Sequence, residues 1–436
     1  MLDINFIRQN SDKVKQGIAK KNINPKLVDK FLKVDAEWRE KTKVFDHLKA
    51  DQNSLSVELA KEQSEHLLSK AQILKKRLAE LFEEKNNLEK KRNEILEGLP
   101  NLPYDDVLIG KDEKENKVLR EVGEKPKFSN KGGFEPKDYL TLGEKLGIIN
   151  TKKAAEVAGS RFGYLMKEAA LLEFGLVKLA LEILVKEGFT PVVPPVMIKP
   201  EVFAGMGRLA SSQKEERYYL PKDELYLAGS AEHTIGPLHM NEVLEEKDLP
   251  KRYVAFSSCF RREAGSYGRD TKGILRVHQF DKVEMFSFAK PEESEKEHQF
   301  LLRMQEKLIQ ALKLPYRVVE ICTGDMGWTD ARQYDIEIWM PGQNDGKGEY
   351  RETHSCSNTT DFQARGINAK YKQATSNKKQ EIKDKEHKTE HVHMLNATAF
   401  AIGRMIIAII ENYQTKNGTI VVPEVLREFV GKENIE

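Results

Sequence analysis

Two long stretches near the start of the chain repeat apolar residues at alternating intervals of three and four residues. The first covers residues 27–59 and the second covers residues 67–95. This spacing is the heptad pattern of helices that pair along a narrow seam. The polar segment KEQSEH (61–66) separates the two stretches. The pattern predicts an antiparallel hairpin of two helices, each roughly 45–50 Å long at about 1.5 Å per residue.

The charges of this hairpin do not reveal its partner. Basic and acidic residues nearly balance between residues 26 and 97. A solvated or dimerising coiled coil is therefore favoured, with a nucleic-acid probe as the alternative. The segment GLPNLPYDDVLIG (98–110) is typical of a domain boundary because it combines prolines and glycines. We predict an N-terminal domain over 1–110, with the hairpin at about 27–97, and a second domain over 111–436.

The pattern changes from about residue 160. ALLEFGLVKLALEILVKEG (170–188) has apolar residues on more than one helical face, which predicts a buried helix that ends at Gly188. FTPVVPPVMIKP (189–200) favours an edge strand or an interface segment, since it mixes β-branched residues with prolines. Strand patterns follow at 224–229, 252–260, 281–289, 316–321, 334–340 and 349–357, with one amphipathic helix at 291–314. The order predicts an α+β fold, a mostly antiparallel sheet flanked by helices.

Composition narrows the class of protein only in part. A chain of 436 residues with net charge +2 holds two to three domains and neither requires nor excludes a polyanionic partner. The cysteines Cys259, Cys322 and Cys356 form no CxxC pair, which favours a reducing compartment. The start has no apolar signal segment, and no run of 18 apolar residues could span a bilayer. We therefore expect a cytoplasmic protein that does not associate with a membrane.

Arginines supply the candidate chemistry. The chain has neither a GxxxxGK[ST] loop nor a GxGxxG after a strand, so a bound nucleotide would need another cradle. Guanidinium groups grip phosphate oxygens two at a time. In the stretch 259–286, Arg261, Arg262 and Glu263 precede a Gly-Ser-x-Gly turn, and alternation in RVHQFDKVEMF (276–286) places Arg276, Phe280 and Glu284 on one face. An exposed face with one aromatic ring is the alternative.

Two further segments could complete a phosphate site. In YRETHSCSNTTDFQAR (350–365), Glu352 and Ser355 are oxygen ligands suited to Mg²⁺ on a phosphate. In HVHMLNATAFAIGRMIIAIIENYQ (391–414), Asn396 and Thr398 precede an apolar helix that contains Arg404. The partner of Arg404 is a phosphate or an ordinary buried carboxylate. His391 and His393 form an HxH pair, for which a zinc site is the less favoured reading, and no GxSxG elbow is present.

Taken together, these segments resemble the class II aminoacyl-tRNA synthetases, and specifically the seryl-tRNA synthetase family of bacterial type. FTPVVPPVM resembles class II motif 1, FRRE with RVHQFDKVEMF resembles motif 2, and NATAFAIGR resembles motif 3. The seryl family also accounts for the hairpin arm, MLDINFIRQN, NLPYDDVLIGKDEKEN, GSAE (229–232), YRETHSCSN and IVVPEVLREFVG. The similarity covers nearly the whole chain in order.

The resemblance implies roles for individual residues. Arg261, Arg276 and Arg404 would be catalytic cations that hold the phosphates. The ATP site would comprise Arg261, Arg262, Glu263, Val277, Phe280, Glu352, Thr353, His354, Ser355 and Arg404, with Phe280 stacked on the adenine. Glu352 and Ser355 would hold Mg²⁺, and no zinc is expected. Serine would contact Ser230, Ala231, Glu232, Arg261, Glu284, Asn396 and Thr398.

The resemblance also implies a reaction and partners. ATP and L-serine would form seryl-adenylate, from which the serine passes to tRNA(Ser); charging of tRNA(Sec) is left open. The arm would lie on tRNA held by the other subunit of a homodimer, through backbone contacts and shape. Three departures from the family concern Ser-Ala-Glu in place of Thr-x-Glu, Ala397 after the motif 3 asparagine, and the longer lysine-rich segment 368–390.

Three rival interpretations compete with this one. A synthetase-like ligase that loads an amino acid onto a carrier protein would lack the long arm. A catalytically silent, RNA-binding paralogue would have lost Arg261, Glu352 or Arg404, and all three are present. Threonyl or prolyl specificity would predict an anticodon-binding domain after motif 3, where only about 30 residues follow Arg404.

Overall fold

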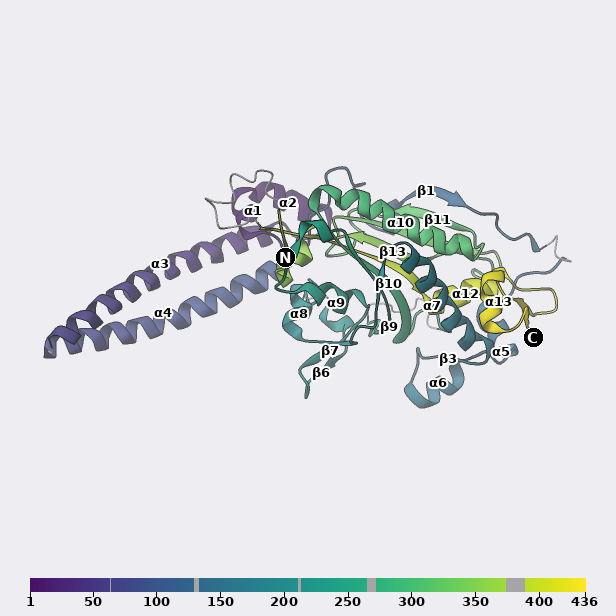
Figure 1. Ribbon diagram of the computed structural model, residues 1–436, viewed down its shortest axis with the longest axis horizontal. Coiled ribbons are helices and arrows are strands. Elements are labelled where there is room, and N and C mark those ends of the chain that lie inside the picture. The colour runs from purple at the N-terminus through teal and green to yellow at the C-terminus, as the bar shows by residue number, and fades with distance from the viewer. Residues whose placement is uncertain (63, 129–132, 211–212, 265–271, 374–388) are drawn as a thin grey trace. The chain divides into compact units, whose positions relative to one another are not determined.

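The computed structural model describes residues 1–62, 64–128, 133–210, 213–264, 272–373 and 389–436 (Figure 1). The chain divides into two compact units, Met1–Pro100 and Asn101–Glu436. The sequence pattern placed the boundary ten residues later, after residue 110. Asn101 explains the difference, because its backbone N–H donates to the carbonyl of Trp328 and its side-chain amide donates to the carbonyls of Thr329 and Thr359. The segment after Pro100 is therefore bonded into the larger unit.

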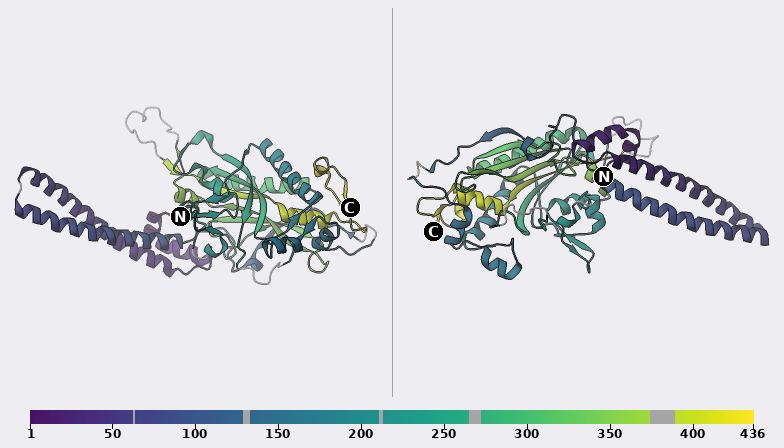
Figure 2. Two further views of the ribbon diagram at one scale, coloured as in Figure 1. Left: turned by 90° about the horizontal axis from the view of Figure 1, so that it is seen from below. Right: turned by 180° about the vertical axis from the view of Figure 1, so that it is seen from behind.

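The first unit consists of helices. They are α1 (Ile4–Gln9), α2 (Ser11–Lys20), α3 (Lys26–Lys61) and α4 (Glu65–Glu97). The predicted hairpin is confirmed, since α3 and α4 run side by side along their length (Figures 1 and 2). The rings of Phe45 and Phe82 lie 6.1 Å apart between their centroids. The connection is shorter than the predicted 61–66, because the hydroxyl of Ser64 accepts a hydrogen bond from the N–H of Leu67 and starts α4 early.

The larger unit contains an eight-stranded sheet. Its spatial order is β1 (Lys117–Val122), β11 (Tyr316–Glu320), β12 (Arg332–Met340), β13 (Glu349–Asn358), β16 (His393–Ala401), β10 (Gln279–Ala289), β9 (Lys251–Phe260) and β4 (Thr190–Val192). All neighbours are antiparallel except β4 and β9. The predicted mostly antiparallel sheet is confirmed, and the proline-containing strand β4 lies at its edge, as expected.

Among the residues that the structure describes, shorter strands form four small sheets. They are β2 (Ile149–Asn150) with β3 (Tyr164–Leu165); β5 (Met197–Ile198), β7 (Leu225–Leu227) and β6 (Tyr219–Leu220); β15 (Thr389–His391), β14 (Lys370–Lys372) and β8 (Val243–Glu245); and β17 (Ile420–Val421) with β18 (Asn434–Ile435). The middle part of the lysine-rich segment 368–390 lies outside the described residues.

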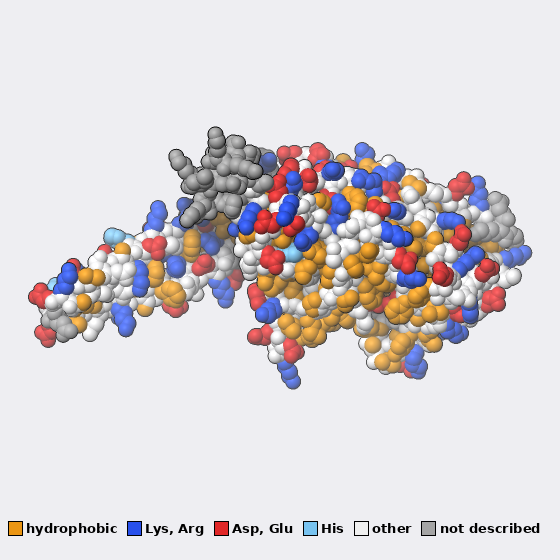
Figure 3. Space-filling model, in the orientation of Figure 1, with side chains coloured by type: hydrophobic (Ala, Val, Ile, Leu, Met, Phe, Trp, Pro, Cys, Tyr) orange, Lys and Arg blue, Asp and Glu red, His pale blue; other side chains and the backbone are white. Residues whose placement is uncertain are grey.

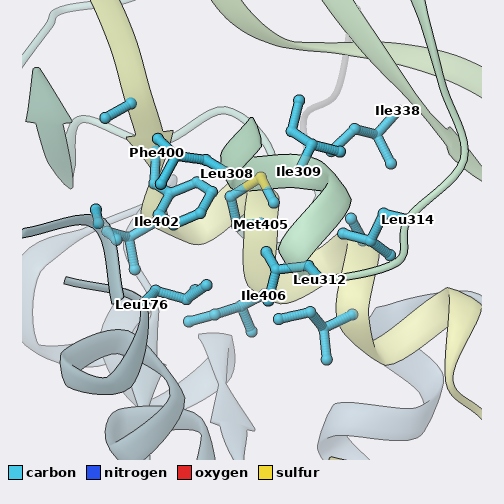
Figure 4. Packing of buried hydrophobic residues seen from close by; sticks show 14 of the residues in the cluster. Leu176, Leu308, Ile309, Leu312, Leu314, Ile338, Phe400, Ile402, Met405 and Ile406 are labelled. Carbon is cyan, nitrogen blue, oxygen red and sulfur yellow. The ribbon is translucent and has the colours of Figure 1, made fainter. Parts of the chain in front are cut away.

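The larger unit also contains α-helices, some of which pack on the eight-stranded sheet. They are α5 (Tyr139–Lys145), α6 (Thr151–Ala158), α7 (Glu168–Lys186), α8 (Pro200–Gly205), α9 (Glu232–Ile235), α10 (Ser294–Ala311), α11 (Phe362–Ile367), α12 (Ile402–Asn412) and α13 (Glu424–Val430). Leu176 of α7, Leu308 and Ile309 of α10, and Met405 and Ile406 of α12 pack into one apolar core (Figure 4). This core holds α12 and the end of β16 in place, and both border the cavity described below.

The prediction of a buried helix at 170–188 is only half right. α7 ends as expected, with Gly188 at φ 89° after its last turn. One face is buried through Leu172 and Leu176, whereas Phe174 on the other face is 56% exposed. The apolar residues on more than one face thus reflect a helix with one face in the core and one on the surface of the single chain.

The structure also bears on membrane-spanning helices and on the state of the cysteines. In the part of the chain that the structure describes, no helix combines the length and the apolar character that crossing a membrane requires. Cys259, Cys322 and Cys356 are free thiols and all three are buried.

Candidate active site

One face of the sheet carries a cavity of about 490 Å³. Its walls come from β10, β13 and β16, from the start of α12, and from the segment that leads into α9. Fourteen residues predicted for ATP, Mg²⁺ or serine line it: Ser230, Glu232, Arg261, Glu263, Arg276, Val277, Phe280, Glu284, Glu352, Thr353, Ser355, Asn396, Thr398 and Arg404. Segments far apart in the sequence therefore converge on one site.

Three predicted residues do not line the cavity. Ala231 is buried at the start of α9, and its side chain carries no polar group. Arg262 donates its Nε–H to the carbonyl of Arg217, 3.0 Å away, and lies over the ring of Tyr218. His354 lies on the opposite face of β13, where its Nε2 is 2.9 Å from the carbonyl oxygen of Ala399. These three side chains therefore lie away from the cavity lining, and their contacts with ATP or serine stay predictions.

A bulge in β13 explains why Glu352 and Ser355 share the cavity. Residues three apart on a regular strand point to opposite faces. Here the pairing with β12 shifts between Ile336 and Glu337, so that Thr353 is the additional residue. Glu352 and Ser355 therefore face the same side, as a joint role in holding a metal requires.

The strand β10 contributes a second wall. Phe280, Lys282 and Glu284 alternate along it and face the cavity, and the ammonium of Lys282 pairs with the carboxylate of Glu284. The prediction that Arg276 belongs to the same strand is wrong, because β10 begins only at Gln279. Arg276 reaches the cavity from the preceding segment, where its Nη1 lies 2.7 Å from the carboxylate of Glu263. The predicted Gly-Ser-x-Gly turn (265–268) lies outside the described residues.

Cationic side chains next to the carboxylates of the cavity shift the pKa values of those carboxylates. The side chain of Glu352 is 52% exposed, so desolvation only weakly disfavours its ionised form, and Arg404 and Arg261 hold its pKa below the ordinary value. Arg404 lies 3.3 Å from the carboxylate of Glu352 and donates to its carbonyl oxygen at 2.7 Å. Burial raises the pKa of Glu284, with Lys282 acting in the opposite direction. The wall thus combines cations for phosphates with carboxylates that suit an ammonium group.

Several lining residues were not predicted from the sequence. The clearest are Arg208, Arg217, His233 and Asp330. Arg208 pairs with Glu232 at 2.5 Å, and Gln363 donates to the same carboxylate oxygen at 2.8 Å. Arg208, Arg217 and Asp330 come from segments without a recognisable motif, so only the long-range packing reveals them. His233 directly follows the segment GSAE (229–232).

The site has oxygen donors that fit Mg²⁺. The carboxylate of Glu352 and the hydroxyl of Ser355 face the cavity together, and the amide of Gln333 donates to the Ser355 hydroxyl at 3.1 Å. Oxygen ligands from one or two side chains, completed by substrate phosphates, are the usual environment of this ion. Among the described residues, no group of three His, Cys, Asp or Glu side chains is arranged to hold a metal ion.

Comparison with known proteins decides the family. Residues 1–103 match the seryl-tRNA synthetase N-terminal domain, and residues 216–413 match the tRNA synthetase class II core domain (G, H, P, S and T). A serine–tRNA ligase of Pyrococcus horikoshii is 42% identical over 100% of this chain and 97% of its own length. The chain belongs to the seryl-tRNA synthetase family. A bacterial serine–tRNA ligase, from Thermobifida fusca, is 40% identical over 99% of this chain and 98% of its own length.

Solved structures agree with this membership. The seryl-tRNA synthetase of Pyrococcus horikoshii complexed with ATP superposes with a TM-score of 0.85 at 40% identity, covering 100% of this chain and 99% of that one. A prolyl-tRNA synthetase of Giardia lamblia reaches 0.53 at 14% identity over 66% of this chain and 54% of its own, a likeness of fold only. The seryl-tRNA synthetase fold expected from the sequence is confirmed. Within this fold, Ser230, Ala231 and Glu232 are buried.

Proposed function

We propose that the protein is an ATP-dependent serine–tRNA ligase, which activates L-serine as seryl-adenylate and transfers the serine to tRNA(Ser). The observation that carries this proposal is the cavity itself. It combines Arg261, Arg276 and Arg404 with the ring of Phe280 and two buried carboxylates, Glu232 and Glu284. ATP needs cations and a stacking ring, and an amino acid needs a carboxylate for its ammonium group.

The activation step needs orientation and charge neutralisation more than a base. The serine carboxylate is already a nucleophile, and it attacks the α-phosphorus of ATP while pyrophosphate leaves. Arg261 would hold the α-phosphate beside the serine carboxylate, and Arg276 and Arg404 would neutralise the outer phosphates. Phe280 would stack on the adenine. Mg²⁺, held by Glu352, Ser355 and the phosphates, would supply further positive charge for the leaving pyrophosphate.

Serine is selected at the other end of the cavity. Glu232, Glu284 and Ser230 would bind its ammonium group, and Asn396 and Thr398 would bind its hydroxyl. Asn396 supports this role, since its side-chain Nδ2 is buried without a hydrogen-bond partner among the residues that the structure describes. Alanine would leave such groups unpaired, which disfavours it by about 1–3 kcal/mol per group.

The first unit would bring the RNA. We propose that the α3–α4 hairpin binds tRNA(Ser) through contacts with the RNA backbone and by its shape. Transfer of serine to tRNA(Sec) would use the same reaction. The ribose hydroxyl at the tRNA 3′ end then attacks the carbonyl carbon of the seryl-adenylate, and AMP leaves. A carrier-protein ligase is disfavoured because residues 1–103 match the seryl N-terminal domain. We place this reaction in the cytoplasm, where tRNA is used.

A homodimer completes the proposal. Apolar side chains gather on the larger unit over the part of its face where α7, α9 and β9 lie (Figure 3). Phe174 is 56% exposed, and Val193, directly after the edge strand β4, is 89% exposed. A second copy would cover this area. Phe174→Asp should halve the mass measured by light scattering, whereas Val57→Asp, on an equally exposed position of the hairpin, should not change it.

The reaction is tested by amino-acid-dependent exchange of pyrophosphate into ATP. We expect exchange with serine alone among the twenty amino acids. Arg261→Ala should lower it by about 10²–10³-fold, because a preorganised cation at the reacting phosphate is lost. Exchange that serine does not stimulate would refute serine activation and favour a silent RNA-binding paralogue.

A further inference from the structure

The guanidinium groups of Arg217 and Arg261 differ from those of the other arginines that line the cavity. Arg208, Arg276 and Arg404 each have a carboxylate within ion-pair distance, namely Glu232, Glu263 and Glu352. In the described part of the chain, no carboxylate lies within ion-pair distance of Arg217. Its Nε is buried without a hydrogen-bond partner, and its side chain lines the cavity.

The position of Arg217 is built into the site. The backbone carbonyl oxygens of Glu216 and Arg217 accept hydrogen bonds from the N–H and the Nε–H of Arg262, each at 3.0 Å, which ties this segment to the end of β9. The guanidinium packs against Gly229, where a Cβ would lie 2.8 Å from Nη1 of Arg217. The carbonyl of the same glycine accepts from Nε of Arg261 at 3.1 Å. Two guanidinium groups thus meet at Gly229, next to Ser230.

This arrangement is unfavourable for the protein alone. Burial, followed by the charges of Arg261 and Arg208, lowers the pKa of Arg217 to about 10, so it stays charged at neutral pH. Burial and then the charge of Arg217 also keep the neighbouring His233 neutral, with a pKa well below the ordinary value. Stacking on the ring of Phe203, 5.5 Å away, offsets only part of the desolvation. The charges of Glu232 and Glu216 act in the opposite direction and only partly compensate, since neither carboxylate lies within ion-pair distance. A desolvated cation without a paired carboxylate among the described residues is typical of an anion site.

We propose that Arg217 is a further substrate-contacting residue, whose guanidinium donates hydrogen bonds to a phosphate group held beside Arg261 during the reaction. Two guanidiniums at one point suit the non-bridging oxygens of a phosphate diester, which each group can grip in pairs. The phosphate has two sources, the α-phosphate of ATP and its adenylate, or the 3′-terminal phosphodiester of the tRNA. The inference rests on the proposed function and deepens it.

Arg217→Met tests the proposal, since methionine fills much of the same volume without charge. Lys222→Met, on an exposed turn between β6 and β7 outside the cavity, is the matched control. We expect Arg217→Met to lower either kcat/KM for ATP in pyrophosphate exchange or the single-turnover rate of transfer from preformed seryl-adenylate to tRNA, by about tenfold or more. Loss of exchange identifies the α-phosphate, and loss of transfer alone identifies the tRNA phosphate. Arg217→Lys should recover part of the loss.

The same variants separate function from folding. Because Arg217 is desolvated and has no paired carboxylate among the described residues, its replacement by methionine should not lower the melting temperature, whereas a purely structural arginine would lower it. Gly229→Ala should reproduce the kinetic defect by displacing Nη1, and should add little to Arg217→Met. Unchanged exchange and transfer in an active Arg217→Met enzyme, or a change confined to KM for serine, would overturn the proposal. Failure of the proposed function is distinct, since the wild-type protein would then show no serine-dependent exchange.

Discussion

The hairpin arm and the cavity of the larger unit use charged residues in opposite ways. On the arm, Lys41 and Glu84 pair between α3 and α4 while both side chains stay exposed, at 38% and 43%. In the cavity, Arg208 and Glu232 pair with 15% and 6% exposure. Water screens the first pair and is excluded from the second. Charged residues on the arm therefore keep its surface solvated. Charged residues in the cavity are desolvated at a cost in free energy, and they are placed to bind substrates.

The largest effect on stability is expected when the buried ion pair is broken and the exposed pair serves as the control. Arg208→Met leaves Glu232 buried without its main partner, and it should lower the free energy of unfolding by about 3–5 kcal/mol. Lys41→Met should leave stability within error, because its partner Glu84 is solvated. Urea denaturation of both variants measures the difference. Equal losses in the two variants would contradict the contrast between arm and cavity.

A smaller effect is expected from a matched pair of aromatic substitutions. Phe280 lines the cavity, and the guanidinium of Arg261 lies 5.2 Å from its ring centroid. Phe280→Ala should raise KM for ATP in pyrophosphate exchange by about 10–100-fold, since a stacked base is worth about 1–3 kcal/mol. Phe82→Ala, whose ring is 47% exposed on the arm, should leave exchange unchanged. If Phe280→Ala leaves KM for ATP unchanged, the adenine does not stack on this ring.

The smallest effect concerns pH. Burial raises the pKa of Glu411 in α12 from 4.5 to about 7, although the N–H groups of Gly342 and Tyr139 donate to it. Between these values the folded protein holds a proton that the unfolded chain has released. Stability should therefore be full below about pH 4.5 and decline by about 1–3 kcal/mol as pH rises to 7.

Glu411→Gln should flatten this decline, as thermal melting between pH 5 and 8 would show. Glu84→Gln is the control on the arm. Lys41 lowers the pKa of Glu84, so the stability it contributes is present above pH 4.5 and changes little in this range. A wild-type melting temperature that is constant from pH 5 to 7 would refute the protonated state of Glu411.

The two regions also differ in how far the sequence predicts them. The heptad seam predicts α3 and α4 nearly to the residue, because each helix needs only its own periodicity and one neighbour. Alternation predicts that Phe280 and Glu284 share a wall, since both lie inside β10. It fails for Arg276, which precedes the strand. The family resemblance implies a contact of His354 with ATP, whereas a bulge in β13 turns this side chain to the face opposite Glu352 and Ser355. Arg208 and Arg217 could not be found, because long-range packing alone brings them to the cavity.

The division of labour between arm and cavity can be tested in one protein. Phe45 and Phe82 lie side by side, so residues 46–81 can be replaced by a short glycine linker that shortens the hairpin without disturbing its base. Serine-dependent pyrophosphate exchange should stay at the wild-type level, while kcat/KM for tRNA(Ser) in aminoacylation should fall by about tenfold or more, as expected when several backbone contacts are lost. Aminoacylation at the wild-type level by the shortened protein would contradict the role assigned to the arm.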